Sequence, residues 1–263
     1  MAEVLERGNI YFVYRPKVEH TTAAGLEDVQ RFFVILSPFH RSPTDQPSDR
    51  GQVAEARYRL LMIGRKRLPA IGDDQERNWA FVQKVASKPD DVEDELDRLT
   101  YSTATRGERH VSPARPAGEG VYAIARHDDH THLAFALELP ERPGEVQQEL
   151  NIPAEGSYII TVKNPEVGAP PGAGLSQEDR PDLPQRLRER FHGRRFIPVD
   201  PPDFLDQEGT ELVLIGTDED VFEELGVSLD PQHETLETAE LFNDLRMERS
   251  AHPLKPLFEG RWQ

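Results

Sequence analysis

The most regular hydrophobic pattern of the chain lies in residues 119–140, EGVYAIARHDDHTHLAFALELP. Two runs rich in apolar residues flank a polar tip at Asp128 and Asp129, which is typical of a β-hairpin with a short turn. If His127 pairs with His130, the side chains further along the two strands are brought opposite one another in a fixed register. The pattern therefore predicts a central hairpin.

Side chains alternate between the two faces of a strand, so this register sorts the residues of the hairpin. The face that we expect to be buried carries the large apolar side chains of Tyr122, Ile124, Leu133, Phe135 and Leu137. The opposite face carries three imidazoles, those of His127, His130 and His132.

Comparable apolar runs predict the other elements. We expect strands at residues 8–18, 29–38, 57–68, 76–85, 157–163 and 210–216. The first two should be neighbours in a sheet, and the near-continuous apolar run of the second indicates burial on both faces. The stretch 76–85 also fits a short helix, but a strand is favoured. Acidic first turns, terminal glycines and apolar spacing predict helices at 89–99, 183–191, 219–225 and 233–250, and a single helical turn at 144–151.

The order of these elements favours an α+β fold. We expect a mainly antiparallel, strongly twisted sheet that contains the hairpin at about 120–139, with helices at about 90–99, 183–191 and 233–250 packed on it. A doubly wound parallel sheet is the weaker choice, because few β and α units alternate in the first 165 residues.

Proline and glycine concentrate at residues 166–182, which we interpret as a linker or as a long loop. As a linker, it would separate a sheet-rich N-terminal region at 1–165 from a smaller α/β C-terminal region at 183–263; as a loop, it would leave one continuous domain. Turn signals predict a surface loop at 40–55. The apolar, proline-containing tail at 252–263 should be extended and should dock either on its own domain or on a partner subunit.

The composition narrows the choice of function. The formal net charge of −17 argues against general nucleic-acid binding, which needs a basic surface. No apolar run approaches the roughly 18 residues of a membrane span, and the N-terminus lacks the pattern of a secretory signal. The chain contains no cysteine, so disulfides and thiolate ligands are excluded. We therefore expect a soluble, cytoplasmic protein.

Arginine clusters stand out in so acidic a chain. Arginine binds phosphate and carboxylate groups through a rigid fork of N–H donors, and converging clusters would form an anion pocket. The candidate anion-binding residues are Arg106, Arg109, His110, Arg115, Arg65 and Arg67. Ordinary surface ion pairs with the many acidic residues explain the same clusters without a ligand.

The three histidines of the hairpin suggest a metal site. Two imidazoles at i and i+2 on one strand and a third on the paired strand can face one divalent ion such as Zn²⁺, which accepts three histidine ligands and keeps a position open for water. His127, His130 and His132 are the candidate ligands. The alternative is a polar, solvated end of a hairpin.

The sequence contains none of the usual motifs for nucleotide binding, zinc proteolysis or serine hydrolysis: GxGxxG, GxxxxGK[ST], HExxH or GxSxG. It therefore identifies no reaction and leaves open whether the protein is an enzyme. The preferred hypothesis is a binding or regulatory protein whose arginine-rich loops receive an anionic ligand or an acidic segment of a protein partner. The alternative is a metal-dependent hydrolase that uses the three-histidine face.

Overall fold

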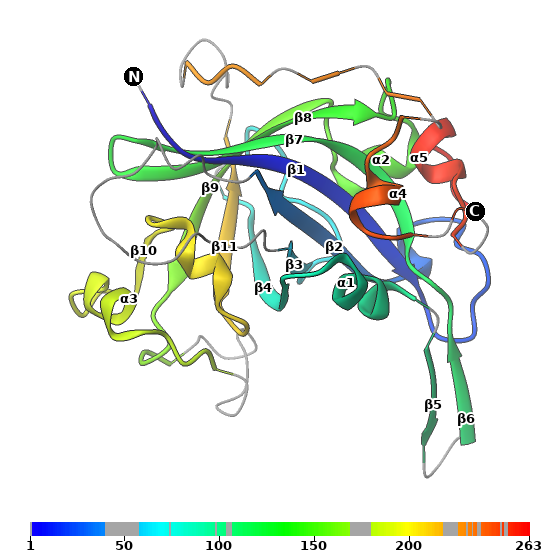
Figure 1. The fold of residues 1–263 in the computed structure, drawn as a ribbon, viewed down its shortest axis with the longest axis horizontal. Helices are drawn as coiled ribbons and strands as arrows, with labels where there is room; N and C mark the ends of the chain where they lie inside the picture. Colours follow the sequence, from blue (N-terminus) through cyan, green and yellow to red (C-terminus); the bar gives the residue numbers. More distant parts are fainter. Residues whose placement is uncertain are drawn as a thin grey trace.

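Eight antiparallel strands form a closed barrel in the computed structural model, and a ninth strand pairs at its side (Figure 1). The strands follow one another around the barrel in the order β9-β11-β4-β3-β2-β1-β7-β8, and pairing of β8 with β9 completes the circle. The structure describes residues 2–39, 58–73, 75–97, 99–103, 107–168, 180–217, 226–229, 231–232, 234–235, 238–247, 249 and 252–263.

The strands of the barrel are β1 (Glu3–Pro16), β2 (Val29–Pro38), β3 (Tyr58–Ile63), β4 (Arg77–Ala86), β7 (Arg115–His127), β8 (His130–Leu139), β9 (Glu155–Lys163) and β11 (Glu211–Gly216). β10 (Phe196–Pro198) pairs with β9, while β5 (Leu99–Thr103) and β6 (Gly107–Val111) form a separate ribbon that projects from the barrel (Figure 1). The helices are short: η1 (Leu26–Asp28), α1 (Pro89–Leu96), α2 (Glu145–Leu150), α3 (Gln185–Arg190), η3 (Pro202–Asp206), α4 (Leu241–Asp244) and α5 (Lys255–Glu259).

The expectation of an open α+β sheet is therefore wrong. The alternation of apolar side chains that predicts each strand is the same in an open sheet and in a barrel. What closes the barrel is the pairing of β8 with β9 and of β4 with β11, and the second of these joins strands far apart in the sequence. The predicted helix at 233–250 is wrong as well: its described part forms helix only in α4.

The register of the central hairpin is confirmed. His127 pairs with His130, Ala125 with His132 and Tyr122 with Phe135. The predicted neighbours β1 and β2 also pair, and residues 77–86 form a strand rather than a helix. The loop predicted at 40–55 and the helix predicted at 219–225 lie outside the described residues.

The domain boundary stays a prediction. Residues 169–179, within the proposed linker, lie outside the described part of the chain. β9 precedes this stretch and β11 follows it, and the two strands pair in the same barrel.

Apolar side chains fill the interior of the barrel. Phe12 lies near its middle, with ring centroids 5.0 Å from Phe135 and 6.4 Å from Phe32. A cavity among these side chains has a volume of about 10 Å³, about the least that a single water molecule requires. Around Phe12 and Phe135 the described interior of the barrel is thus closely packed.

A buried ionic network lies at the end of the barrel next to η3. The guanidinium of Arg59 binds both carboxylate oxygens of Glu6, at 2.6 and 3.0 Å, and its Nε donates to Asp206 at 2.8 Å. Tyr122 donates its hydroxyl to the same Glu6 carboxylate. Because every charge has a close opposite partner, this end can stay buried and polar.

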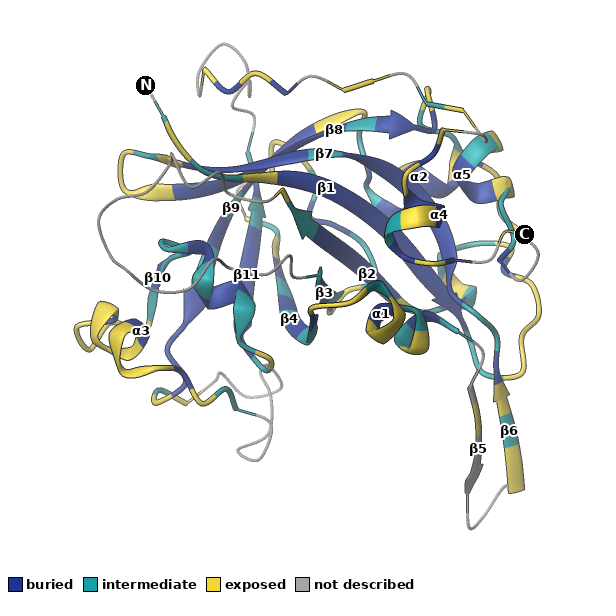
Figure 2. Cartoon of the chain, in the orientation of Figure 1, coloured by how far each residue is buried: buried dark blue, intermediate teal, exposed yellow. Residues whose placement is uncertain are grey.

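Much of the outer surface of the barrel is covered too. Figure 2 shows long stretches of β1, β7 and β8 as buried. One apolar cluster joins the outer side chains of β1 to β3 with α1, α4 and α5. The C-terminal tail packs against its own chain, with Leu257 fully buried, and contains the helix α5 where an extended segment was expected.

The filled interior makes a prediction about stability. Phe135→Ala should lower the free energy of unfolding by about 3–5 kcal/mol, because it leaves a cavity that the surrounding strands cannot close. Ile71→Ala, at a side chain with an exposed fraction of 39%, serves as the control and should cost less than about 1 kcal/mol. Denaturant titration measures both, and equal losses would contradict a packed interior.

Candidate functional site

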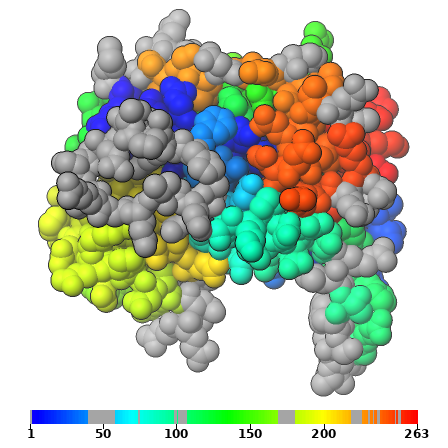
Figure 3. Space-filling view, viewed as in Figure 1, coloured from blue at the N-terminus to red at the C-terminus, as the bar shows by residue number. Residues whose placement is uncertain are grey.

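The C-terminal strap, defined here as the described residues between Gly226 and Met247, crosses the outer face of β1, β7 and β8. In the space-filling view these C-terminal residues (orange) lie beside the N-terminal strand (blue) (Figure 3). The strap places Val227 and Leu229 on an outer patch made of four small side chains, Ala123, Ala125, Ala134 and Ala136. Side chains this small let the strap lie close to the strands.

Carboxylates on the barrel hold the strap through its backbone. Glu119 on β7 accepts hydrogen bonds from the N–H groups of Glu240, at 2.6 Å, and Leu241, at 3.1 Å. Glu138 on β8 accepts one from the N–H of Gln232 at 2.6 Å. Through these three hydrogen bonds the two residues hold the strap against the barrel.

More acidic groups gather at the same place. The N–H of Glu240 is also 3.2 Å from a carboxylate oxygen of Glu234, so Glu119 and Glu234 share one donor. Asn9 donates to the carboxylates of Glu240 and Asp244, and the hydroxyl of Tyr11 donates to Asp244 at 2.6 Å. We call Glu119, Glu138, Glu234, Glu240 and Asp244 the carboxyl cluster.

Burial and mutual repulsion raise the pKa values of several carboxyl groups in this cluster. Burial raises the pKa of Glu119 from its ordinary 4.5 to about 8, with a further contribution from Glu234. The side chain of Glu119 has an exposed fraction of 1%, and its Oε2 atom is buried without a hydrogen-bond donor. A proton on Oε2 removes the charge and supplies a donor for Glu234, so Glu119 is a carboxylic acid at neutral pH.

The pKa values of two other members, Glu138 and Glu234, are also raised. Burial raises the pKa of Glu138 to about 7, and the charges of Glu234 and Glu240 add to the effect. Burial and the charge of Glu240 also raise the pKa of Glu234. The cluster therefore carries less negative charge at neutral pH than its number of acidic residues implies.

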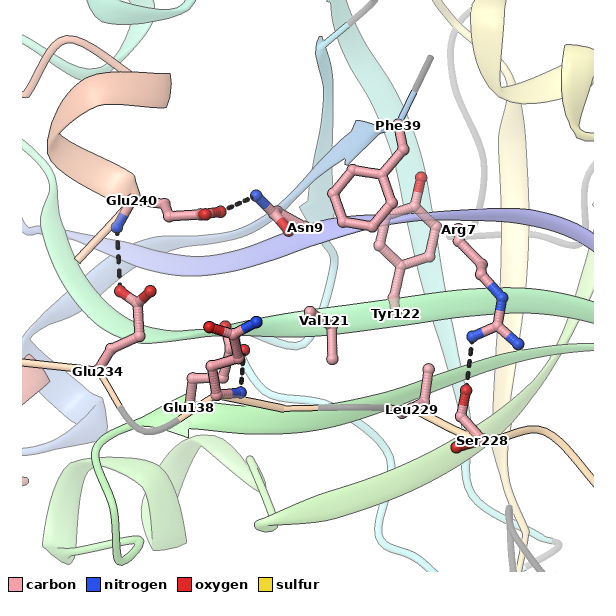
Figure 4. A pocket seen from close by; sticks show the side chains of 11 residues that line it. Arg7, Asn9, Phe39, Val121, Tyr122, Glu138, Ser228, Leu229, Glu234 and Glu240 are labelled. Carbon is pink, nitrogen blue, oxygen red and sulfur yellow. Dashed lines mark hydrogen bonds between the residues drawn. The ribbon is translucent and has the colours of Figure 1, made fainter. Parts of the chain in front are cut away.

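A pocket of about 400 Å³ opens beside the cluster (Figure 4). We call it the acidic pocket, and its described lining consists of Arg7, Asn9, Phe39, Val121, Tyr122, Glu138, Ser228, Leu229, Gln232, Glu234 and Glu240. Three carboxyl groups thus face a space large enough for a small organic molecule. The ring of Phe39 on its wall has an exposed fraction of 54%.

The arrangement suits a positively charged group. An ammonium or guanidinium group could donate hydrogen bonds to the carboxylates and contact the face of an aromatic ring. In the described part of the chain, no three or more His, Asp or Glu side chains have the arrangement of a metal site.

The three predicted histidines do lie together on the outer face of the hairpin. The ring centroid of His132 is 6.3 Å from that of His127 and 6.5 Å from that of His130. His132 is buried, its Nδ1 lies 3.3 Å from the hydroxyl of Ser157, and burial together with the two neighbouring rings lowers its pKa to about 4. Metal binding by this group stays a prediction.

The predicted anion-binding residues have local partners of their own. Arg65 and Arg67 lie 3.5 and 3.4 Å from Glu76. On the projecting ribbon, Arg109 lies 3.4 Å from Glu19, and His110 lies 3.6 Å from Glu108.

Two of the predicted residues stand apart from these pairs. Arg115 is buried and donates to the carbonyl of Thr21, while Arg106 lies outside the described residues. Each described residue of the set thus has a partner within the chain, and anion binding stays a prediction.

Sequence reasoning missed the carboxyl cluster. Glu138 stands between Leu137 and Leu139 in a strand with an otherwise apolar pattern, and Glu119 begins the same hairpin. A charged residue inside an apolar strand is a signal, recognisable in the sequence, of a buried carboxyl group. The stretch 233–250 was expected to form one amphipathic helix, whereas its described part is helical only in α4.

Comparisons of the chain with protein-family models, with curated proteins and with solved structures gave no significant match. Among the helices that the structure describes, none combines the length and the apolar character needed to cross a membrane.

The raised pKa of Glu119 predicts how stability changes with pH. The folded state binds this proton more tightly than the unfolded state, so the stabilisation is complete below about pH 4.5 and is lost as the pH rises through about 8. Glu119→Gln keeps an acceptor for the strap and cannot ionise. As the pH rises from 5 to 9, the free energy of unfolding of the variant should increase relative to that of the wild type by on the order of a few kcal/mol.

Denaturant titrations at a series of pH values measure this difference, and Glu141→Gln, at an exposed glutamate, is the matched control. Parallel stability curves for Glu119→Gln and the wild type would show that Glu119 is not protonated in the folded protein.

Proposed function

We propose that the protein is a cytoplasmic binding protein whose acidic pocket takes up the ammonium group of a small organic ligand. The observation that carries the proposal is the carboxyl cluster around an open pocket of about 400 Å³. Glu138, with a pKa raised to about 7, forms part of the wall. A cation in the pocket would favour the ionised form of the carboxyl groups that line it.

Binding, rather than catalysis, is supported by the way the carboxyl groups are held. An oxygen of Glu119 and an oxygen of Glu138 each accept N–H groups of the strap, which fixes both side chains. Glu119 is 1% exposed, so it is in no position to exchange a proton with a substrate. These groups create a negative field at the pocket and orient what enters it.

Both hypotheses drawn from the sequence remain predictions beside this one. The anion hypothesis depends on arginines that have partners within the chain, and the hydrolase hypothesis depends on a metal at the histidine face. Inorganic phosphate and Zn²⁺ are the probes for them. Binding of phosphate that is lost in Arg109→Ala, with no binding of an amine, would favour the anion hypothesis over the one proposed here.

The amine proposal predicts binding that strengthens with pH. Isothermal titration with n-hexylamine should give a dissociation constant that falls between pH 6 and 8.5, because the proton and the ammonium group compete for the same carboxylates. Glu138→Gln should weaken binding at pH 8 by about tenfold or more, the usual effect of losing a charged hydrogen-bond partner.

Glu141→Gln is again the control and should bind hexylamine like the wild type. Absence of binding to the wild type at pH 8, or an equal affinity in Glu138→Gln, would contradict the proposal.

A further inference from the structure

The acidic pocket has a second end with the opposite charge. Arg7 and Asn9 project from the same face of β1, and Asn9 reaches the carboxylate of Glu240. Figure 4 shows Arg7 on the side of the pocket away from Glu234 and Glu240. A guanidinium and a set of carboxyl groups thus face the same space without lying next to one another.

The strand register gives the scale of this separation. Asn9 on β1 donates to the carboxylate of Glu240, and Arg7 lies two residues before Asn9. Two residues of an extended strand span roughly 7 Å. The two side chains therefore leave the strand roughly 7 Å apart, and that of Arg7 binds Ser228 while that of Asn9 binds Glu240.

Arg7 has capacity for a ligand. Its Nη1 donates to the carbonyl oxygen of Ser228 at 2.6 Å, which holds the side chain against the strap, and a guanidinium has five N–H donors in all. Among the described residues no carboxylate forms an ion pair with Arg7, although three carboxyl groups line the same pocket. A guanidinium held in this way is suited to binding a carboxylate through two parallel hydrogen bonds.

Part of the wall between the two ends is apolar. Val121 and Leu229 line the pocket, together with the half-exposed ring of Phe39. A chain of methylene groups would bury its surface there, while a second charge in the middle would lose its hydration without gaining a partner.

From these three features we infer that the ligand is an ω-amino acid, a zwitterion whose ammonium and carboxylate groups are joined by an apolar chain of several methylenes. The inference rests on the proposed function, because the ammonium end occupies the carboxyl cluster. Arg7 binds the carboxylate end, and Phe39 contacts the chain between them. No covalent step is involved.

The test compares two series of probes at pH 8: ω-amino acids from glycine to 8-aminooctanoate, and n-alkylamines with the same numbers of carbon atoms. For the wild type, isothermal titration should show that the carboxylate strengthens binding by about tenfold or more at one intermediate length. Glycine should bind no more tightly than ethylamine, because it cannot reach both ends of the pocket.

Arg7→Gln separates charge from structure, since glutamine can still donate to the carbonyl of Ser228. In this variant the ω-amino acid should no longer bind more tightly than the alkylamine of the same length, while the alkylamine should bind at least as tightly as it does to the wild type. Arg7→Lys should retain part of the advantage. Arg67→Ala, which removes an arginine paired with Glu76, is the control and should change neither series.

The outcomes separate the two ideas. If alkylamines fail to bind the wild type, the proposed function is wrong. If alkylamines bind but no ω-amino acid binds more tightly, or if Arg7→Gln leaves the advantage intact, the proposed function stands and the zwitterion inference is wrong.

Discussion

Closure of the barrel by the pairing of β8 with β9 is the constraint on which the rest of the structure depends. It turns one face of every strand inward, and the space enclosed by eight strands is small enough for side chains to fill. Phe12, Phe32 and Phe135 occupy its middle, and the cavity left among the core residues measures about 10 Å³. The pocket of about 400 Å³ lies on the outside of the barrel, beside the strap.

On the outside, the C-terminal strap and the carboxyl cluster depend on each other. Glu119 and Glu138 hold the strap by accepting its N–H groups, and the strap brings Glu234, Glu240 and Asp244 to the same place. The strap also covers Glu119 and Glu138, and burial raises their pKa values to about 8 and about 7. The acidic pocket thus lies beside carboxyl groups whose pKa values are raised into the neutral range.

The sequence predicts what is local and fails where distant segments meet. The register about Asp128 and Asp129 is correct because the alternation of residues fixes it. Barrel closure is missed because inward alternation looks the same in an open sheet. The strap is mistaken for a helix because the apolar spacing of Ala239, Phe242 and Leu245 fits a helix face, whereas tertiary contacts with the barrel shape the segment. The acidic pocket could not be found, since it joins residues more than 200 positions apart, such as Asn9 and Glu240.

The central claim is that buried carboxyl groups of the cluster remain protonated near neutral pH. A titration of the side-chain carboxyl carbons by NMR, in protein labelled with ¹³C at glutamate and assigned with Glu119→Gln and Glu138→Gln, measures this directly. The account predicts two resonances that titrate well above the others, near pH 8 and pH 7. Titration of every glutamate below about pH 5.5, the range of exposed carboxyl groups, would contradict it.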